Sequence, residues 1–406
     1  MRLRTFVLGV GLVIAPAIAH AATLEVGPNK PYTSLQAALA AAKKGDEISV
    51  FTTKKSTAYD KSALLIKTPG LNIHPADPNQ PITINGGNFD YSGSGKIPRA
   101  IFQFDKGADG CTLQGFELSG AHNNSHNGAA VRINQANNIT IKNCTIKNND
   151  MGIMSNGEVK DNTGANQLIE FCLIEKNGSD KEPGYNHNLY LGGASATVRG
   201  CEIAFSTTGH NLKSRAHHNW IEYNFIHDAA NRELDLVDAG GNTDIPNSDS
   251  VLLGNIIRKA PNMNGNKTVI HFGKDGKADH TGTLWLVHNT ITSDYISPII
   301  DLSSPNSTAV LLNNIIDAKD PAKITLFKAR GGAKDPTRTL GNLITSQKKA
   351  GAKPAADQVP WDKLDLPWKE FDKNPEPLQH YVAPEKIEAR DPGHLADPGA
   401  AGRTSP

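Results

Sequence analysis

Two stretches of the chain carry side chains that can transfer a proton, and both begin with the same three residue types. The sequence is HNLY at 187–190 and HNLK at 210–213, so Tyr190 and Lys213 follow identical neighbours. Lys213 is a candidate base if burial or a nearby cation lowers its pKa from the usual value of about 10.4. Tyr190 can protonate a leaving oxygen or stack on a ring, and His210 is a candidate acid or base because its pKa lies near neutral pH.

The charged residues around Lys213 decide whether it can serve as a base. Arg215 follows two positions later and is the cation that would lower the lysine pKa. Glu233, Asp235 and Asp238 form an acidic group further along the chain, and a bare carboxylate beside the lysine would raise its pKa instead. Either these three carboxylates hold a Ca²⁺ ion through their oxygen atoms, or Lys213 is a substrate-binding cation paired with them.

A short apolar motif recurs along most of the chain and indicates a repeat architecture. Examples are CTLQGFEL, ITIKNCTI, SVLLGNII and AVLLNNII. Successive motifs lie 23 to 34 residues apart and show the period-two alternation of strands, so each repeat is expected to form one coil of a β solenoid. One motif position is occupied in turn by Phe116, Cys144, Cys172, Cys201, Asn224, Asn255, Asn289, Asn314 and Asn342.

This recurrent position is expected to lie at a corner of the coil. Asparagine side chains there can hydrogen-bond to the backbone and to the equivalent asparagines of neighbouring coils, which would form a ladder. Because coils are about 4.8 Å apart, the cysteines of the same position are expected to form a packed stack of thiols. A disulfide between Cys144 and Cys172, or between Cys172 and Cys201, is the alternative.

A second short strand follows each motif and carries the residues that can do chemistry. Alternation places Val131, Ile153, Leu189, Leu212, Leu234, Ile270 and Ile300 inside the solenoid. The next residue of each strand then faces outward, and these seven residues are named the outward column here. The column consists of Arg132, Met154, Tyr190, Lys213, Asp235, His271 and Asp301.

Several other residues are predicted to bind the ligand of such a column. Arg132 suits a carboxylate because its guanidinium offers a planar pair of donors. His271 and Asp301 extend the column beyond Lys213 as further subsites. The remaining candidates precede the strands that carry Tyr190 and Lys213, and they are His187, Asn188 and Asn211.

The stretch VGPNKPYTSLQAALAAAKKGDEISV resembles the N-terminal segment of the pectate-lyase superfamily, and the likeness covers residues 24–346. The resemblance implies an all-β fold, a right-handed parallel β-helix with a short N-terminal capping helix that covers the first coil. A narrower resemblance, in NHNLYLGG, GHNLKSRAHHN and RELDLVDAGGN, is to secreted bacterial β-helix proteins grouped with polysaccharide lyases. It implies a lysine base with an arginine partner, for which Lys213 and Arg215 are the matching positions.

Together these patterns favour a polysaccharide lyase that cleaves an acidic, uronic-acid-containing polysaccharide by β-elimination. The alternatives are a non-catalytic carbohydrate-binding or surface protein, a hydrolase that uses carboxylates from the group at 233–238, and a C5-epimerase. The net charge of +1 gives no general attraction for nucleic acid or for an anionic membrane. A monomer with an acidic polysaccharide as its partner is expected.

The two ends of the chain differ from the repeats. Residues 1–21 have the basic start, apolar run and small residues of a signal peptide, which predicts a secreted or periplasmic protein without a membrane span. The β-helix domain is expected over 22–346. The proline-rich segment 347–406 is predicted to be irregular, partly packed on the solenoid and partly disordered.

Overall fold

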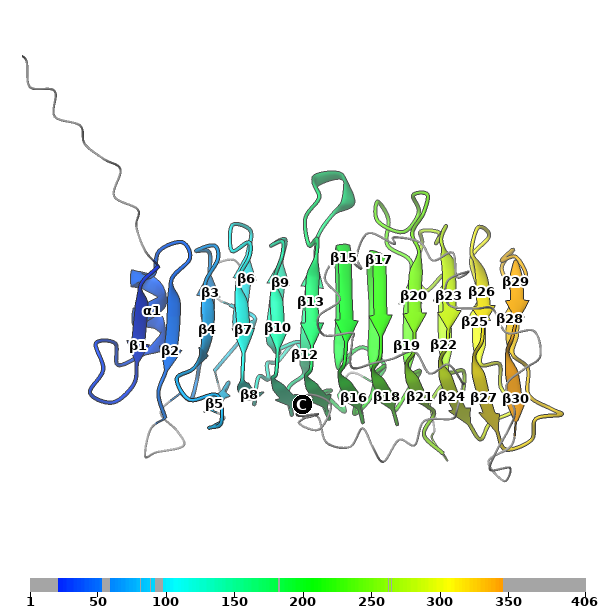
Figure 1. The fold of residues 1–406 in the computed structure, drawn as a ribbon, viewed down its shortest axis with the longest axis horizontal. Helices are drawn as coiled ribbons and strands as arrows, with labels where there is room; N and C mark the ends of the chain where they lie inside the picture. Colours follow the sequence, from blue (N-terminus) through cyan, green and yellow to red (C-terminus); the bar gives the residue numbers. More distant parts are fainter. Residues whose placement is uncertain are drawn as a thin grey trace, which may run out of the picture.

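The computed structural model describes residues 21–52, 59–80, 82–87, 89–91, 98–181, 183–261, 263 and 265–345. The described chain forms a row of stacked coils whose strands run across the long axis of the molecule (Figure 1). Strands of neighbouring coils pair in parallel and in register. The prediction of a right-handed parallel β-helix is therefore confirmed. The predicted signal peptide lies outside the described residues, except for Ala21, and so does the segment 347–406.

Each complete coil contributes a strand to three faces. The first face contains β1 (Thr23–Val26), β2 (Glu47–Val50), β4 (Asn72–Pro75), β7 (Thr112–Gln114), β10 (Thr140–Lys142), β13 (Gln167–Glu170), β20 (Ser250–Leu253), β23 (Thr283–Val287), β26 (Thr308–Leu312) and β29 (Arg338–Leu340). The second face contains β5 (Ile82–Asn85), β8 (Phe116–Ser119), β11 (Thr145–Lys147), β14 (Leu173–Glu175), β16 (Glu202–Ala204), β18 (Phe225–His227), β21 (Ile256–Arg258), β24 (Thr290–Ser293), β27 (Ile315–Ala318) and β30 (Leu343–Thr345). The third face contains β3 (Leu64–Ile66), β6 (Ala100–Asp105), β9 (Ala129–Asn134), β12 (Met151–Asn156), β19 (Leu234–Val237), β22 (Ile270–Gly273), β25 (Ile300–Leu302) and β28 (Phe327–Ala329).

Two long strands join the third face to the first without a break. They are β15 (Leu189–Arg199) and β17 (Leu212–Glu222), which pair with each other over nearly their whole length. Their first halves continue the third face, and their second halves continue the first face. A short 3-10 helix, Val159–Asp161, lies between β12 and β13.

The predicted capping helix is present as α1 (Leu35–Ala41) at the N-terminal end of the solenoid (Figure 1). The side chain of Ser34 caps it by accepting a hydrogen bond from the Ala37 N–H at 3.2 Å. The buried Leu35 and Ala38 pack the helix on β1, β2 and β3. The cap therefore covers the apolar interior that the first coil would otherwise expose.

The predicted ladder occupies the corner between the first and second faces. The Asn255 side chain accepts hydrogen bonds from the Asn224 backbone and side chain, both at 3.0 Å, and donates to Asn289 at 3.0 Å. The same pattern continues to Asn314 and Asn342. On the N-terminal side cysteines occupy the ladder position. The backbone N–H of Cys144 points at the sulfur of Cys172, and the backbone N–H of Cys172 points at the sulfur of Cys201. All four cysteines are free, so the thiol stack rather than a disulfide is confirmed.

One residue with a left-handed backbone conformation turns the chain at this corner. Positive φ angles occur just before the ladder position in residues such as Phe171, Tyr223 and Asn313. Where an aromatic residue takes this place, the next coil has glycine, because a Cβ at Gly200 would lie 2.7 Å from the Phe171 ring and one at Gly254 only 2.6 Å from the Tyr223 ring.

The outward column is also confirmed by the strand register. Arg132 pairs with Met154, Met154 with Tyr190, and Tyr190 with Lys213. The series continues from Lys213 to Asp235, then to His271 and Asp301.

No helix among the described residues is long and apolar enough to cross a membrane.

Loss of a central ladder residue should destabilise the protein strongly. In Asn255→Ala, the buried Asn224 N–H and the Ile221 carbonyl, which Asn255 now satisfies, would lose their partners. Each unsatisfied buried group costs about 1–3 kcal/mol, so we expect the free energy of unfolding to fall by about 3 kcal/mol, as measured by urea unfolding. Asn342→Ala, at the partly exposed end of the ladder, is the matched control and should cost less. Equal losses would argue against the ladder as a source of stability.

Candidate functional site

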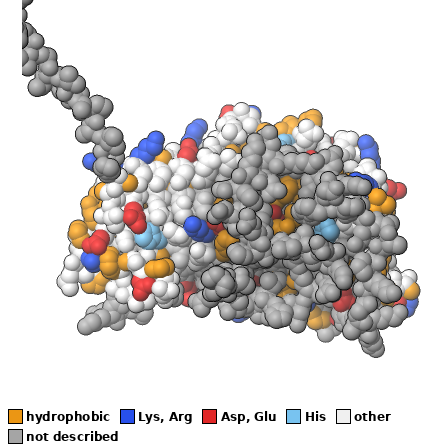
Figure 2. Space-filling view, in the orientation of Figure 1, with side chains coloured by type: hydrophobic (Ala, Val, Ile, Leu, Met, Phe, Trp, Pro, Cys, Tyr) orange, Lys and Arg blue, Asp and Glu red, His pale blue; other side chains and the backbone are white. Residues whose placement is uncertain are grey.

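The outward column lies on the third face and changes in character along the solenoid. Tyr190, Met154 and Arg132 are partly exposed, whereas Lys213 is 8% exposed and Asp235 is fully buried. Charged side chains of both signs are interspersed with apolar ones on the described part of the face in view (Figure 2). The charged members of the column are likewise of both signs, from Arg132 and Lys213 to Asp235 and Asp301, so the column gives a local site and not a broad field of one sign.

Lys213 is held between two carboxylates. Its Nζ lies 3.0 Å from Asp235 Oδ2 and 2.7 Å from Asp275 Oδ2. Burial lowers the pKa of Lys213, but the two carboxylates outweigh this effect and the pKa is raised above its ordinary value. The lowered pKa that Lys213 would need to work as a base is therefore not found, and its contacts match the alternative of a cation paired with these carboxylates.

Arg215 connects three groups at the open side of the site. Its Nε donates a hydrogen bond to the Tyr190 hydroxyl oxygen at 3.0 Å, and its Nη2 lies 2.9 Å from Asp275 Oδ2. Its Nη1 donates to the carbonyl oxygen of Asp238. The guanidinium is thus fixed by partners on three sides, with a quarter of its side chain exposed. Its positive charge therefore lies within hydrogen-bond distance of the phenol oxygen of Tyr190.

Asp235 is a buried anion that contacts two cations, Lys213 and Arg232, and two histidines. Arg232 Nη1 lies 3.0 Å and His271 Nδ1 2.8 Å from its Oδ1, while Lys213 and His210 approach its Oδ2. Burial raises the Asp235 pKa, but His210, the His271 hydrogen bond and Lys213 hold it well below its usual range. The carboxylate is ionised and has no free face for a substrate.

The predicted acid or base His210 lies behind the column. The Arg232 N–H donates to its Nδ1 at 3.1 Å, so the ring proton is on Nε2, which faces Asp235 at 3.3 Å. Burial lowers the pKa of His210 to about 4, and the ring is neutral near pH 7. It stacks on His187, which is 2% exposed and meets the Tyr190 ring edge-on. Both histidines are therefore placed to support the column from inside, where a polymer cannot reach them.

Asp238 organises the loop that carries Asp275. Its carboxylate accepts hydrogen bonds from the N–H groups of Asp275 at 2.5 Å, Gly276 at 2.7 Å and Ala278 at 3.0 Å. A Cβ at Gly276 would lie 2.9 Å from Asp238 Oδ2, so a larger residue there would make this carboxylate shift. Asp238 thereby fixes Asp275 over Lys213 and Arg215.

Three predicted site residues belong instead to a second ladder inside the solenoid. It begins at Asn149 and Asn177. It continues as Asn188 Nδ2 donates to Asn211 Oδ1 at 2.8 Å, and Asn211 Nδ2 to Glu233 Oε2 at 2.7 Å. Asn188, Asn211 and Glu233 are all fully buried, so the prediction that the two asparagines bind substrate is corrected by their position.

Glu233 ends the second ladder in a buried ion pair. Its Oε1 lies 3.6 Å from Lys259 Nζ, and neither side chain is exposed. Burial raises the pKa of Glu233 to about 7 and lowers that of Lys259 to about 8. The pair replaces an asparagine rung inside the core and does not face the column.

The three carboxylates proposed for calcium do not fit such an ion. Asp235 is surrounded by Lys213, Arg232 and two histidines, Asp238 is occupied by backbone N–H groups, and Glu233 faces a lysine. A cation bound there would have to displace positive charges that already neutralise these groups. The described residues also contain no cluster of three or more histidine, cysteine or acidic side chains that could hold a metal ion.

The charged side chains at the two ends of the column differ in how far neighbouring residues already neutralise them. Asp301 is bound by Arg330 through two contacts of 2.9 Å, and His271 is 2% exposed, so neither is open as the predicted subsite. Arg132 has no carboxylate within ion-pairing distance among the described residues, and its Nη1 contacts only the Met154 sulfur, at 3.8 Å. Burial and nearby Arg99 lower the Arg132 pKa, and the carboxylate of Asp105 offsets this only in part.

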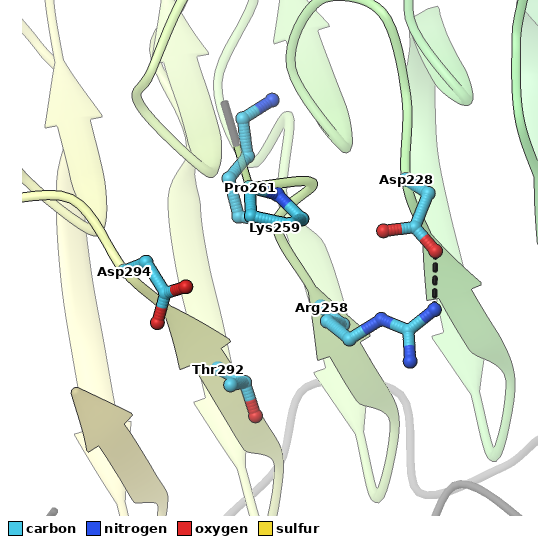
Figure 3. Close-up of a pocket in the computed structure, with 6 residues that line it drawn as sticks. All are labelled: Asp228, Arg258, Lys259, Pro261, Thr292 and Asp294. Carbon is cyan, nitrogen blue, oxygen red and sulfur yellow. Dashed lines mark hydrogen bonds and ion pairs between the residues drawn. The ribbon is translucent and has the colours of Figure 1, made fainter. Parts of the chain in front are cut away.

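A pocket of about 340 Å³ lies at the carboxyl ends of strands of the second face. Figure 3 shows Arg258 turned toward Asp228, with which it forms an ion pair. The pocket is lined by Asp228, Arg258, Lys259, Pro261, Thr292 and Asp294. No residue of the outward column lines this pocket, so the described pocket and the column are separate features.

Sequence reasoning missed Asp275, Arg232 and Ser303, of which the last lies 2.7 Å from His271 Nε2. Arg232 was detectable, because it lies three residues before Asp235, just ahead of the strand that carries it. Asp275 is 62 positions from Lys213 and lies in a loop whose path the repeat does not determine.

The buried neutral histidines should make the fold sensitive to acid. His210 has a pKa of about 4 when folded and 6.5 when unfolded, so the folded chain binds fewer protons between these values and loses stability as the pH falls. We expect His210→Asn to remove about 2–3 kcal/mol of the difference in unfolding free energy between pH 7 and pH 4. Urea unfolding at both pH values measures this, with the half-exposed His122→Asn as control. An unchanged difference would contradict the assignment.

Comparison with known proteins gives likeness in structure alone. No protein-family model and no curated protein sequence matches the chain. The pectate lyase Pel9A is 13% identical, with 88% of this chain and 82% of that chain covered and a TM-score of 0.47. A pectin methylesterase from carrot is 11% identical over 82% and 90% of the chains, with a TM-score of 0.35. Pectin methylesterase PemA from Erwinia chrysanthemi is 9% identical over 87% and 95%, with a TM-score of 0.32.

Proposed function

We propose that this protein is an exported polysaccharide lyase, which binds an acidic, uronic-acid-containing polysaccharide along the outward column and cleaves it by β-elimination. The observation that carries the proposal is the pair of Tyr190 and Arg215. A phenol lies on the open side of the column with a guanidinium nitrogen 3.0 Å from its oxygen, one coil from the Lys213 ammonium. A proton-transfer group and two positive charges are thus gathered on one surface.

The reaction needs a group that accepts a proton from C5 of the uronate. In this scheme the Tyr190 oxygen, in its phenolate form, takes that proton, with the Arg215 Nε–H 3.0 Å away. The Arg215 guanidinium, a quarter of which is exposed, is the cation that neutralises the C6 carboxylate and the negative charge that develops beside it, while Lys213 holds Asp275 in place beneath it. Electrons of the broken C5–H bond form the C4–C5 double bond, the C4–O4 bond breaks, and O4 receives the proton from Tyr190.

Arg132 supports a polymer as the ligand. It is two coils from Tyr190 along the column, which corresponds to about 10 Å. Its charge is only partly compensated and suits a second carboxylate on the same polysaccharide chain. Subsites therefore extend from Tyr190 toward the N-terminal end of the solenoid, because the column beyond Asp235 is buried or already paired.

A non-catalytic carbohydrate-binding protein is the second candidate. It is favoured by the complete pairing of Lys213 with Asp235 and Asp275, which an ion-paired binding cation would also show. A hydrolase has less support, since Asp235 and Glu233 are fully buried and Asp238 is 2% exposed. A C5-epimerase shares the proton abstraction, but returns the proton to C5 from the other face and forms no double bond.

Replacement of the phenol tests the catalytic assignment. We expect Tyr190→Phe to lower kcat by about 10²–10⁴-fold, the usual contribution of a positioned acid or base, while KM changes little. The measurement is the ultraviolet absorbance of the unsaturated uronate product, over a panel of acidic polysaccharides. Met154→Leu, at the preceding position of the column, is the matched control.

The outcomes separate the candidate functions. Binding of a polysaccharide without a double bond or new chain ends would favour the non-catalytic protein, and C5 inversion would favour the epimerase. New reducing ends without the absorbance would mean hydrolysis. A Tyr190→Phe variant as active as the wild type would overturn the role of the phenol.

Arg132 should act on binding and not on chemistry. We expect Arg132→Ala to raise KM for a polymer about tenfold, the loss of one charged hydrogen bond, and to leave kcat nearly unchanged. Steady-state kinetics with long and very short oligomers measure this effect, which should vanish for oligomers too short to reach the arginine. Arg199→Ala, on the first face and paired with Glu170, is the control. A fall in kcat without a change in KM would contradict this role.

A further inference from the structure

The outer surface of the first face changes from polar to apolar partway along the solenoid. In one row of paired residues, Thr112, Thr140, Leu168 and Thr197, with one leucine among three threonines, give way to an unbroken apolar run of Trp220, Val251, Trp285 and Val310. In the parallel row, Gln114, Lys142 and Arg199 give way to Leu253, Val287 and Leu312. The apolar face is defined here as Trp220, Val251, Leu253, Trp285, Val287, Val310 and Leu312.

These apolar side chains point outward, because the alternate residues of the same strands fill the interior. Leu252, Leu286 and Leu311 are the inward residues and are buried in the main core. The outward residues form a separate cluster, in which Trp220, Tyr223 and Trp285 pack on the aliphatic side chains. The solenoid therefore has a second apolar layer on the outside of this face.

The apolar face is nevertheless withdrawn from solvent. Val251, Val287 and Leu312 are 0% exposed, whereas Thr140 and Thr197 of the same face are partly exposed. An outward side chain on a sheet loses its last solvent contact only when something lies over it. A contiguous apolar patch of this kind on the outside of a folded domain marks an interaction site.

We propose that the C-terminal segment of the same chain docks on this face, through the stretch WDKLDLPWKEF at 361–371. This stretch contains Trp361, Trp368 and Phe371 in addition to two leucines. The chain has four tryptophans, and two of them are on the apolar face while the other two are in this stretch. A single contact would bring all four together, which explains why the aromatic residues are placed there.

The length of chain permits this contact. β30 ends at Thr345 in the last coil, and the 16 steps from 345 to 361 can span up to about 50 Å. Trp285 is two coils and Trp220 four coils from the last strand of the first face, which corresponds to about 10–20 Å. The segment would then lie along the side of the solenoid instead of over its C-terminal end. This inference does not depend on the proposed function.

Hydrogen exchange of the full chain tests the contact from the side of the segment. We expect amides of 361–371 to exchange at least tenfold more slowly than those of 395–406, and Val251→Asp to remove most of this protection. Thr197→Asp, two coils away in the same row, is the matched control and should leave the protection intact. Exchange of 361–371 at the rate of an unfolded peptide in the wild type would overturn the proposal.

A reciprocal variant covers the case that Val251→Asp fails to fold. In Trp361→Phe/Trp368→Phe the only tryptophans are Trp220 and Trp285, and their emission should be blue-shifted and poorly quenched by acrylamide. Adding Leu366→Asp should shift the emission to the red and increase quenching severalfold, whereas Pro406→Asp should not. Unchanged quenching would overturn the proposal. A dimer that forms with rising protein concentration, as measured by light scattering, would also overturn the proposal if the tryptophans became exposed only when it dissociates. The occupant of the apolar face would then be a second copy of the chain.

Discussion

The in-register parallel pairing of one coil with the next is the constraint on which the structure depends. Because each coil repeats the hydrogen-bonding positions of its neighbour, a side chain meets its equivalent about 4.8 Å away. A position that tolerates stacking, such as the asparagine of the first corner, can be used repeatedly. A position that carries charge cannot, since like charges at that distance repel each other.

The site follows from this constraint. Lys213 and Asp235 are consecutive members of the outward column, so the stacking itself makes them an ion pair. Loops after β19 and β22 then add Asp238 and Asp275, and Arg215 ties them to Tyr190. The result is a buried, balanced charge network with a phenol at its open edge, and Arg132 further along has no such compensation.

The sequence was a good guide wherever period-two alternation holds. It predicted the first ladder, the thiol stack and every member of the outward column, because each depends only on the repeat. It was a poor guide at the corners, where alternation stops: Asn188 and Asn211 are predicted to bind substrate, yet they turn inward to form the second ladder. The sequence left open whether the Lys213 pKa is raised or lowered, and it could not show Asp275, which comes from a loop whose path no repeat determines.

The single-residue corner between the first and second faces also limits how this protein can vary. A residue inserted there would shift the ladder out of register and would expose buried amide groups along the whole stack. The opposite corner, where β19 and β22 leave the third face, connects through loops of unequal length, and longer loops cost little free energy of closure. New specificity can therefore be acquired by lengthening or exchanging these loops, while the scaffold beneath them stays the same.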